Sequence, residues 1–79
     1  MGRRKFVVTA EWDEDARVWV AESDDVPGLI VEAATSDEMI AKLQKLVPEL
    51  LGLGGQLRKG RTGILEILTQ FRARAEIPH

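Results

Sequence analysis

The first third of the chain alternates apolar and polar residues, the pattern of β-strands that have one buried face. The first stretch covers residues 5–12, the second residues 17–23, and a shorter third one residues 29–33. One face of the first stretch is apolar throughout: Phe6, Val8, Ala10 and Trp12. The short acidic segment between the first two stretches can turn. The pattern therefore predicts a β-hairpin followed by a third strand.

The hairpin has two alternative registers. A loop that closes through Glu14–Ala16 places Trp12 opposite Val18, whereas a four-residue loop places Trp12 opposite Trp19. Side chains alternate between the two faces of a strand, so a slip of one residue exchanges the faces of the second strand. Both registers remain open from the sequence.

A turn is predicted between the second and third strands, at Val26-Pro27-Gly28. Proline fixes φ for the first corner of a turn, and glycine accepts positive φ at the second corner.

A helix is predicted to begin at Thr35, because Glu38 follows at the capping-box spacing. Its apolar stripe repeats at helical spacing: Met39, Ile40, Leu43, Leu46, Val47, Leu50 and Leu51. Pro48 cannot donate a backbone hydrogen bond, so the pattern predicts a kink or a restart there. Gly52 is the predicted end of the helix.

The rest of the chain is a glycine-rich segment and a last element. Residues 52–63 hold five of the seven glycines and are predicted to form a flexible loop. Residues 64–77 alternate with period two, which favours a long strand, although a helix is a weaker alternative because Leu65, Leu68 and Arg72 also share a helical face. We expect residues 1–4 to be disordered.

These elements predict one α+β domain of order β-β-β-α-β over residues 1–79. Three strands form an antiparallel meander, and the helix carries the chain across to a fourth strand. A right-handed crossover places that strand parallel to a meander strand, most simply the first. The helix covers one face of the sheet, and the other face, with Val7 and one tryptophan, needs a partner or stays partly exposed.

Length and composition favour self-association in a reducing compartment. A chain of 79 residues buries a small fraction of its surface, and small domains compensate with disulfides, metals or association. There is no cysteine, and the single histidine is His79. We therefore expect a homo-oligomer, with a dimer favoured. No apolar run reaches the about 20 residues of a membrane span, and no secretory signal is recognisable, so we expect a cytoplasmic protein without a membrane partner.

The net charge of −2 conceals an acidic block. Residues 11–38 contain ten acidic residues and one basic residue, Arg17. Such asymmetry can steer a partner of opposite charge, although a solvated face is the simpler interpretation.

The run from Asp13 to Leu29, followed by Thr35–Glu38 at the start of the predicted helix, resembles the amino-terminal domain of HicB-type antitoxins. The resemblance is closer still to a branch of small, stand-alone, largely uncharacterised HicB-like proteins. That branch has the phrase V-W-V-A-x-S-x-D-V-P-G-L, here Val18–Leu29, and a later P-E-L-L, here Pro48–Leu51. The resemblance implies a truncated ribonuclease-H-like β-β-β-α-β fold. It also implies a type II toxin–antitoxin role, in which the domain neutralises a small basic toxin. HicB antitoxins usually continue into a DNA-binding segment, and we expect none after His79.

Together, resemblance and charge predict a non-catalytic protein-binding module. The alternative is a stand-alone homo-oligomeric structural or regulatory domain without a toxin partner. The candidate partner-binding residues lie in or beside the acidic turn: Asp13, Trp19, Glu22, Asp24, Asp25, Pro27 and Gly28.

The sequence gives only weak support for a nucleotide site, a nuclease site or a nucleic-acid interface. Gly55–Thr62 mimics a phosphate-binding loop, but such a loop needs a strand before it and a helix after it. The carboxylates near the hairpin could be remnants of a two-metal nuclease site, yet acidic residues at a hairpin end are typically a solvated turn. The basic residues Arg3, Arg4, Lys5, Arg58, Lys59 and Arg61 lack interleaved aromatics, which argues against nucleic acid. We expect no enzyme activity, cofactor or metal.

Overall fold

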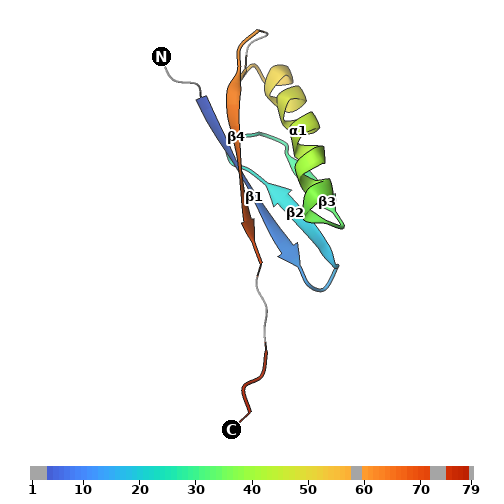
Figure 1. The fold of residues 1–79 in the computed structure, drawn as a ribbon. Coiled ribbons are helices and arrows are strands. Elements are labelled where there is room, and N and C mark those ends of the chain that lie inside the picture. The colour runs from blue at the N-terminus through green and yellow to red at the C-terminus, as the bar shows by residue number, and fades with distance from the viewer. Residues whose placement is uncertain (1–3, 58–59, 72–74, 79) are drawn as a thin grey trace.

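The structure is a computed structural model that describes residues 4–57, 60–71 and 75–78. It contains four strands and one helix, in the predicted β-β-β-α-β order (Figure 1). The elements are β1 (Arg4–Asp13), β2 (Val18–Glu22), β3 (Ile30–Ala33), α1 (Ser36–Leu53) and β4 (Gly63–Gln70). The α+β prediction is therefore confirmed. Arg4, expected to be disordered, is the first residue of β1, and residues 1–3 and 58–59 lie outside the described residues.

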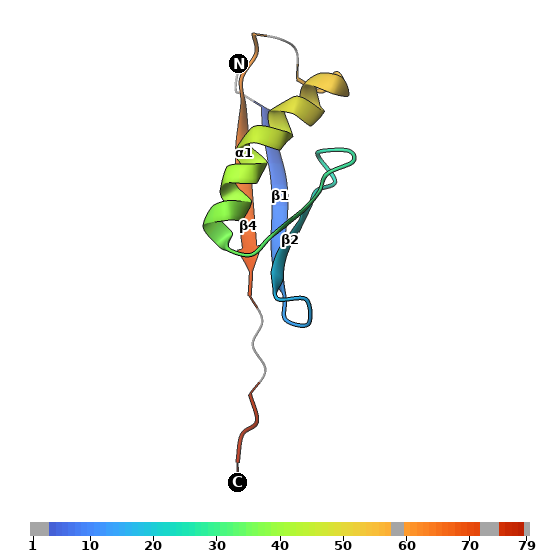
Figure 2. The same cartoon turned by 90° about the vertical axis from the view of Figure 1, so that its right-hand side faces the viewer.

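One sheet holds all four strands, in the order β3-β2-β1-β4. β1 pairs antiparallel with β2, and β2 pairs antiparallel with β3, so the meander is as predicted. β4 pairs parallel with β1, which confirms that the crossover returns to the first strand. Figure 2 shows α1 lying across one side of this sheet.

The hairpin register places Trp12 opposite Trp19, the four-residue-loop alternative. The Asp13 carbonyl accepts from the Arg17 backbone N–H at 2.7 Å, and the Asp13 carboxylate accepts from the backbone N–H groups of Asp15 and Ala16. Arg17 closes the loop with φ of 59°. The two indole rings meet edge to face with centroids 5.6 Å apart. Asp13 thus fixes the loop length, and the loop length fixes the register.

This register corrects one expectation about the faces of the sheet. Residues opposite each other on neighbouring strands share a face, so Trp12 and Trp19 both lie on the side that α1 covers. The other face therefore carries Val7 but, among the described residues, no tryptophan.

The helix begins as predicted and ends slightly later. The Thr35 hydroxyl accepts the Glu38 backbone N–H at 3.1 Å, which caps the first turn. α1 is continuous through Pro48, which is exposed, and it ends at Leu53 with Gly54 as the cap. Pro48 removes one backbone hydrogen bond, but Val47 and Leu51 on either side of it are fully buried. Their burial holds the helix together where the sequence predicted a kink or a restart.

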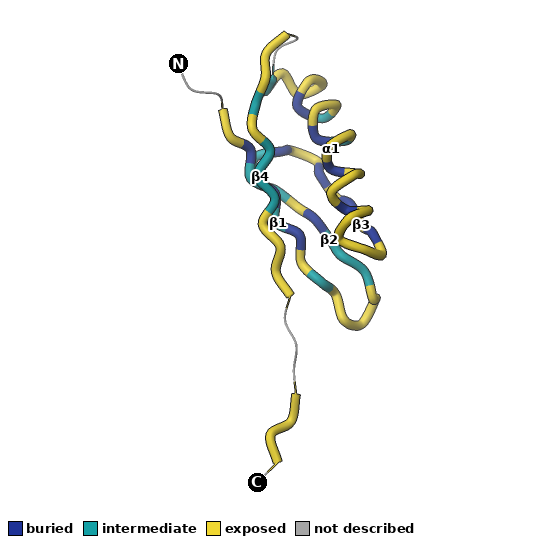
Figure 3. The backbone as a smooth tube through the Cα atoms, in the orientation of Figure 1, coloured by how far each residue is buried: buried dark blue, intermediate teal, exposed yellow. Residues whose placement is uncertain are grey.

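The core lies between α1 and the sheet, where the buried positions of both gather (Figure 3). The helix contributes residues at intervals of four: Met39, Leu43, Val47 and Leu51. The sheet contributes mostly small or branched side chains: Phe6, Val8, Ala10, Ala21, Val31 and Ala33. The small alanines let the helix approach the sheet closely. Fully burying each of the larger side chains contributes about 1.5–3 kcal/mol.

The turn before β3 also contributes side chains to the core. The Leu29 backbone N–H donates to the Val26 carbonyl at 3.2 Å, with Pro27 and Gly28 at the two corners. Gly28 has φ of +80°, the left-handed value that the second corner of a type II turn requires. Val26 and Leu29 are buried on the inside of the turn. The turn predicted from Pro27 and Gly28 is confirmed, and it closes the end of the core.

β4 is shorter than predicted. It ends at Gln70 instead of residue 77, and residues 75–78 form no strand. The reason is the partner strand: pairing with β1 reaches Glu11 opposite Gln70, and β1 enters the hairpin loop after Asp13. Alternation in the sequence continues, but β1 offers hardly any backbone for pairing beyond Gln70.

Two glycine-to-alanine substitutions, one in the turn and one in the helix, test whether the turn requires positive φ at residue 28. Gly28→Ala should lower the free energy of unfolding by about 1–2 kcal/mol, because alanine resists positive φ. Nothing lies within 4 Å of the added Cβ at either Gly28 or Gly52. Gly52→Ala, in the helix, is therefore the matched control and should raise stability by about 0.5–1 kcal/mol. Urea unfolding followed by tryptophan fluorescence measures both changes, and equal stabilities of the two variants would contradict the turn geometry.

Candidate functional site

The sheet face opposite α1 is not covered by any helix or strand of the described residues (Figures 1 and 3). We call it the open face. Strand alternation and register place six aliphatic side chains on it: Val7, Val18, Val20, Ile30, Ile64 and Leu68. They also place five acidic residues there: Glu11, Asp13, Glu22, Glu32 and Glu66. Carboxylates and aliphatic groups thus share one surface.

The register interleaves these two kinds of side chain. One row across the sheet reads Ile30, Glu22, Thr9, Leu68, and the next reads Glu32, Val20, Glu11, Gln70. Ile30 is 78% exposed and Leu68 47% exposed, so large apolar side chains meet solvent between the acids. The open face is therefore neither a plain solvated surface nor a plain hydrophobic patch.

Few cations neutralise this face within the described part of the chain. Lys5 lies 3.4 Å from the Glu66 carboxylate across the β1–β4 pair. Two further ion pairs, Arg17 with Glu14 and Lys42 with Glu38, are in the hairpin loop and on α1. Over the described residues, Glu11, Glu22 and Glu32 have no ion-pair partner. The open face is acidic at neutral pH.

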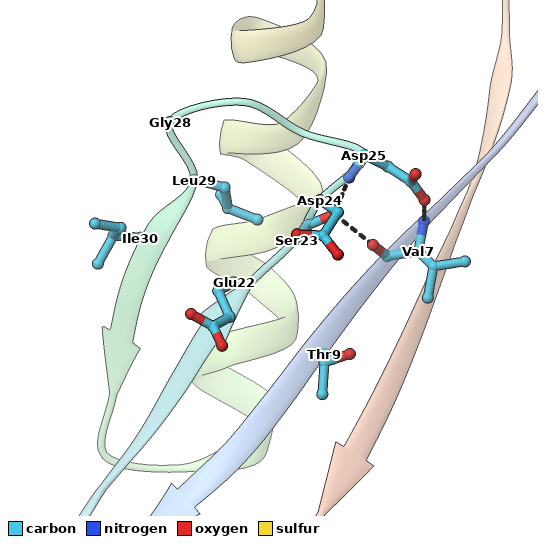
Figure 4. A pocket seen from close by; sticks show the side chains of 9 residues that line it. All are labelled: Val7, Thr9, Glu22, Ser23, Asp24, Asp25, Gly28, Leu29 and Ile30. Carbon is cyan, nitrogen blue, oxygen red and sulfur yellow. Dashed lines mark hydrogen bonds between the residues drawn. The ribbon is translucent and has the colours of Figure 1, made fainter.

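A depression of about 540 Å³ lies where β2 leaves the sheet (Figure 4). It is lined by residues of β1, of the end of β2 and of the following turn: Val7, Thr9, Glu22, Ser23, Asp24, Asp25, Gly28, Leu29 and Ile30. Glu22, Asp24 and Ile30 are exposed there. The depression is a recessed corner of the open face with acidic and aliphatic walls.

At this corner, side chains of the turn make the hydrogen bonds to β1 that β2 no longer makes. The β1–β2 ladder ends at Thr9 opposite Glu22, so Val7 has no backbone partner on β2. The Val7 backbone N–H instead donates to the Asp25 carboxylate at 2.8 Å, and the Ser23 hydroxyl donates to the Val7 carbonyl. The Asp25 backbone N–H donates to the Ser23 hydroxyl at 3.0 Å, which completes the link (Figure 4). Ser23 and Asp25 therefore tie the turn to β1.

The structure brings together four of the seven candidate partner-binding residues. Glu22, Asp24, Asp25 and Gly28 line the depression, and Pro27 is exposed at the corner of the same turn. Within this group Asp25 and Gly28 have structural roles, in the link to Val7 and in the positive-φ corner. Glu22 and Asp24 are the exposed carboxylates that remain for a partner.

The other two candidates lie elsewhere. Asp13 is on the open face, but it sits at the far end of the hairpin, where its carboxylate holds the loop. Trp19 is half-buried on the helix-facing side, packed against the core. Trp19 is thus separated from the acidic residues by the thickness of the sheet.

Sequence reasoning missed Ser23 and the aliphatic members of the open face. The Ser-x-Asp spacing at Ser23 and Asp25 was a usable signal, because these residue types commonly hydrogen-bond to nearby backbone groups. Ile30, Ile64 and Leu68 gave no signal of their own, since alternation cannot say which face a helix will cover.

Other chemistry finds little support in the geometry. No group of three or more His, Cys, Asp or Glu side chains within the described residues could hold a metal ion. The glycine-rich segment follows α1 and precedes β4, the reverse of a phosphate-binding loop. Of the helices that the structure describes, none is long and apolar enough to cross a membrane.

Separate replacement of Asp24 and Asp25 distinguishes an exposed carboxylate from one that stabilises the fold. Asp25→Ala should destabilise the fold by about 1–3 kcal/mol, because it leaves the Val7 N–H without its acceptor. Asp24→Ala removes an exposed side chain and should change stability by less than about 0.5 kcal/mol. Urea unfolding measures the loss, and amide hydrogen exchange should show reduced protection at Val7 in Asp25→Ala alone. Unchanged protection at Val7 would contradict the link.

Comparison with known proteins places the chain in a family. The family model described as "Domain of unknown function (DUF1902)" matches residues 5–77. The chain is similar to the hypothetical protein TTHA1013 from the extremely thermophilic bacterium Thermus thermophilus, known from a crystal structure. The two are 43% identical over 94% of this chain and 100% of that chain, with a TM-score of 0.65. No curated protein matches the chain. The family match takes in all of β2, β3, α1 and β4 and nearly all of β1, so the chain belongs to the DUF1902 family.

Proposed function

We propose that this chain is a non-catalytic protein-binding module whose open face holds a basic protein. The observation that carries the proposal is the interleaving, on that face, of aliphatic side chains with carboxylates that have no ion-pair partner in the described part of the chain. Glu22 lies between Ile30 and Thr9 across the sheet, and Glu11 is opposite Val20.

Each component of the face has a separate role in binding. The aliphatic groups supply burial, which is favourable by about 25 cal/mol per Å² of apolar surface removed from water. The carboxylates supply charge complementarity, which raises the association rate and disfavours acidic partners. The fitting partner presents lysines or arginines interleaved with apolar side chains.

The HicB-like phrase supports the same conclusion independently of charge. The segment Val18–Leu29 resembles the toxin-neutralising domain of HicB-type antitoxins, whose partners are small basic proteins. In this chain the phrase builds β2, the link to Val7 and the turn around Gly28. It therefore shapes the depression and presents Glu22 and Asp24 at its rim. A truncated ribonuclease-H-like relationship and an antitoxin-like role are both parts of this proposal.

A stand-alone homo-oligomeric domain is the second candidate function. It is favoured by a different observation, the apolar outer edge of β4, whose Leu68 is 47% exposed. The self-association would use the edge strand β4, whose Leu68 also belongs to the open face, and the two functions are compatible in one molecule.

Charge reversal on the open face tests the proposed function. If the neighbouring reading frame encodes a small basic protein, that protein is the probe, and its binding is measured by calorimetric titration. Reversing Glu11 and Glu22 together to lysine should weaken its binding by about tenfold or more, since rows of like charge then face the partner. Wild-type binding should also weaken as salt is raised from about 0.05 to 0.5 M.

Asp15→Lys combined with Asp37→Lys is the matched control, because both residues are exposed, Asp15 in the hairpin loop and Asp37 in the first turn of α1. It changes net charge by the same amount and should leave affinity within about twofold, a change of about 0.4 kcal/mol. Equal weakening by both changes would mean that only overall charge matters. No binding by the neighbouring basic protein, or no such reading frame, would contradict the antitoxin-like role and favour the homo-oligomeric function.

A further inference from the structure

β4 has the sequence of an interior strand but lies at an edge. Its residues read G-I-L-E-I-L-T-Q, with aliphatic side chains on both faces. Ile64 and Leu68 are 42% and 47% exposed on the open face, and Leu65 and Ile67 are half-buried on the helix side. A long apolar strand at the edge of a sheet leaves free backbone groups that can pair with another chain. In the described residues, β4 has a neighbour only on the side of β1.

The two edges of the sheet are unequal. β3 is only four residues long, and the Lys42 ammonium group on α1 donates to the Glu32 carbonyl at 2.9 Å. A short strand and a lysine at the edge are both devices that prevent strand addition. β4 is eight residues long and contains neither lysine nor proline. An edge of that kind is a template for pairing with another strand.

The pattern of β4 is self-complementary about Glu66. The five residues from Ile64 to Leu68 read I-L-E-I-L, so the aliphatic pattern is the same in both directions. In an antiparallel pair of β4 strands centred on Glu66, Ile64 lies opposite Leu68 of the second copy. Leu65 then lies opposite Ile67 of the second copy, on the helix side. Every aliphatic residue of the strand meets another aliphatic residue.

The centre of this arrangement brings two Glu66 side chains together. Like charges directly opposite each other are destabilising. Each Glu66 carboxylate, however, lies 3.4 Å from Lys5 of its own chain, so both signs of charge meet at the two-fold axis. Lys5 thus supplies positive charge to a part of the open face that is otherwise acidic in the described residues.

We propose that two copies of this chain pair antiparallel through β4, with Glu66 at the two-fold axis, and form one continuous sheet. The occupant of the edge is a second copy because the same strand supplies both the free backbone and the matching aliphatic pattern. A two-fold contact of this kind is closed and stops at the dimer. The contact is confined to one pair of strands, so we expect a dimer that dissociates on dilution.

This inference does not rest on the proposed binding of a basic protein. The dimer uses the edge of β4, whereas the charge reversal above changes Glu11 and Glu22 on β1 and β2. Failure of one leaves the other standing.

Sedimentation equilibrium from about 1 to 500 µM tests the dimer, because a small contact is expected to be weak. Wild-type protein should be dimeric at the upper end. Leu68→Lys, a charge on the pairing edge, should weaken the dimer by about tenfold or more. Ile30→Lys is the matched control, because Ile30 is more exposed than Leu68 but belongs to β3 at the other edge. It should leave the dissociation constant unchanged.

Single cysteines test the register, since the natural chain contains none. In the proposed dimer, residue 66 lies opposite its own copy, so Glu66→Cys should form an intermolecular disulfide with oxidised glutathione. Glu32→Cys, on the opposite edge, should stay reduced under the same conditions. A wild-type monomer at the highest concentration, equal dimers of Leu68→Lys and wild type, or equal cross-linking at the two positions would overturn the proposal.

Discussion

The structure depends on one packing contact: the apolar stripe of α1 against one face of the sheet. Met39, Leu43, Val47 and Leu51 are each at most 2% exposed, and they cover Phe6, Val8 and the small side chains between them. A chain of 79 residues supplies a single helix in its described part, so only one sheet face can be buried in this way. The exposed face and the exposed edge are both consequences of that limit.

The link between Val7 and the segment from Ser23 to Asp25 satisfies backbone groups of β1 that β2 leaves without partners. β2 must leave the sheet early, so that Val26 and Leu29 can close the end of the core. Its departure would leave the Val7 backbone groups without partners, and unsatisfied backbone groups are costly when shielded from water. One hydroxyl and one carboxylate satisfy both groups. The acidic turn therefore stabilises the fold through Asp25 and exposes Asp24 beside it.

Sequence alone predicted those features that depend on local patterns. Alternation located the strands, the Thr35–Glu38 spacing located the start of the helix, and Pro27 with Gly28 located the turn. Features that depend on distant partners were missed or left open. The hairpin register follows from the hydrogen bonds of Asp13, and the end of β4 follows from where β1 turns away. Continuity of α1 through Pro48 follows from burial on both sides of it.

The candidate site was predictable only in part, for the same reason. Acidic residues at the turn were visible as charge, and Glu22 and Asp24 do lie together at one depression. Trp19 is a candidate because aromatic anchors are common at interfaces, yet the register opposite Trp12 places it on the helix side of the sheet. The role of Asp25 could not be seen without its partner, because Val7 is 18 residues away along the chain.

The two proposed surfaces affect each other through charge. An antiparallel pair of β4 strands keeps both helices on one side of the joined sheet, so the two open faces form one larger acidic surface. Each chain carries a net charge of −2, and bringing two such chains together is opposed by their like charge. A basic protein bound across the open faces would neutralise that repulsion and so favour the dimer. By thermodynamic linkage, the dimer would then bind the basic protein more tightly than the monomer does. If both proposals hold, the exposed surface that one helix leaves uncovered would couple self-association to partner binding.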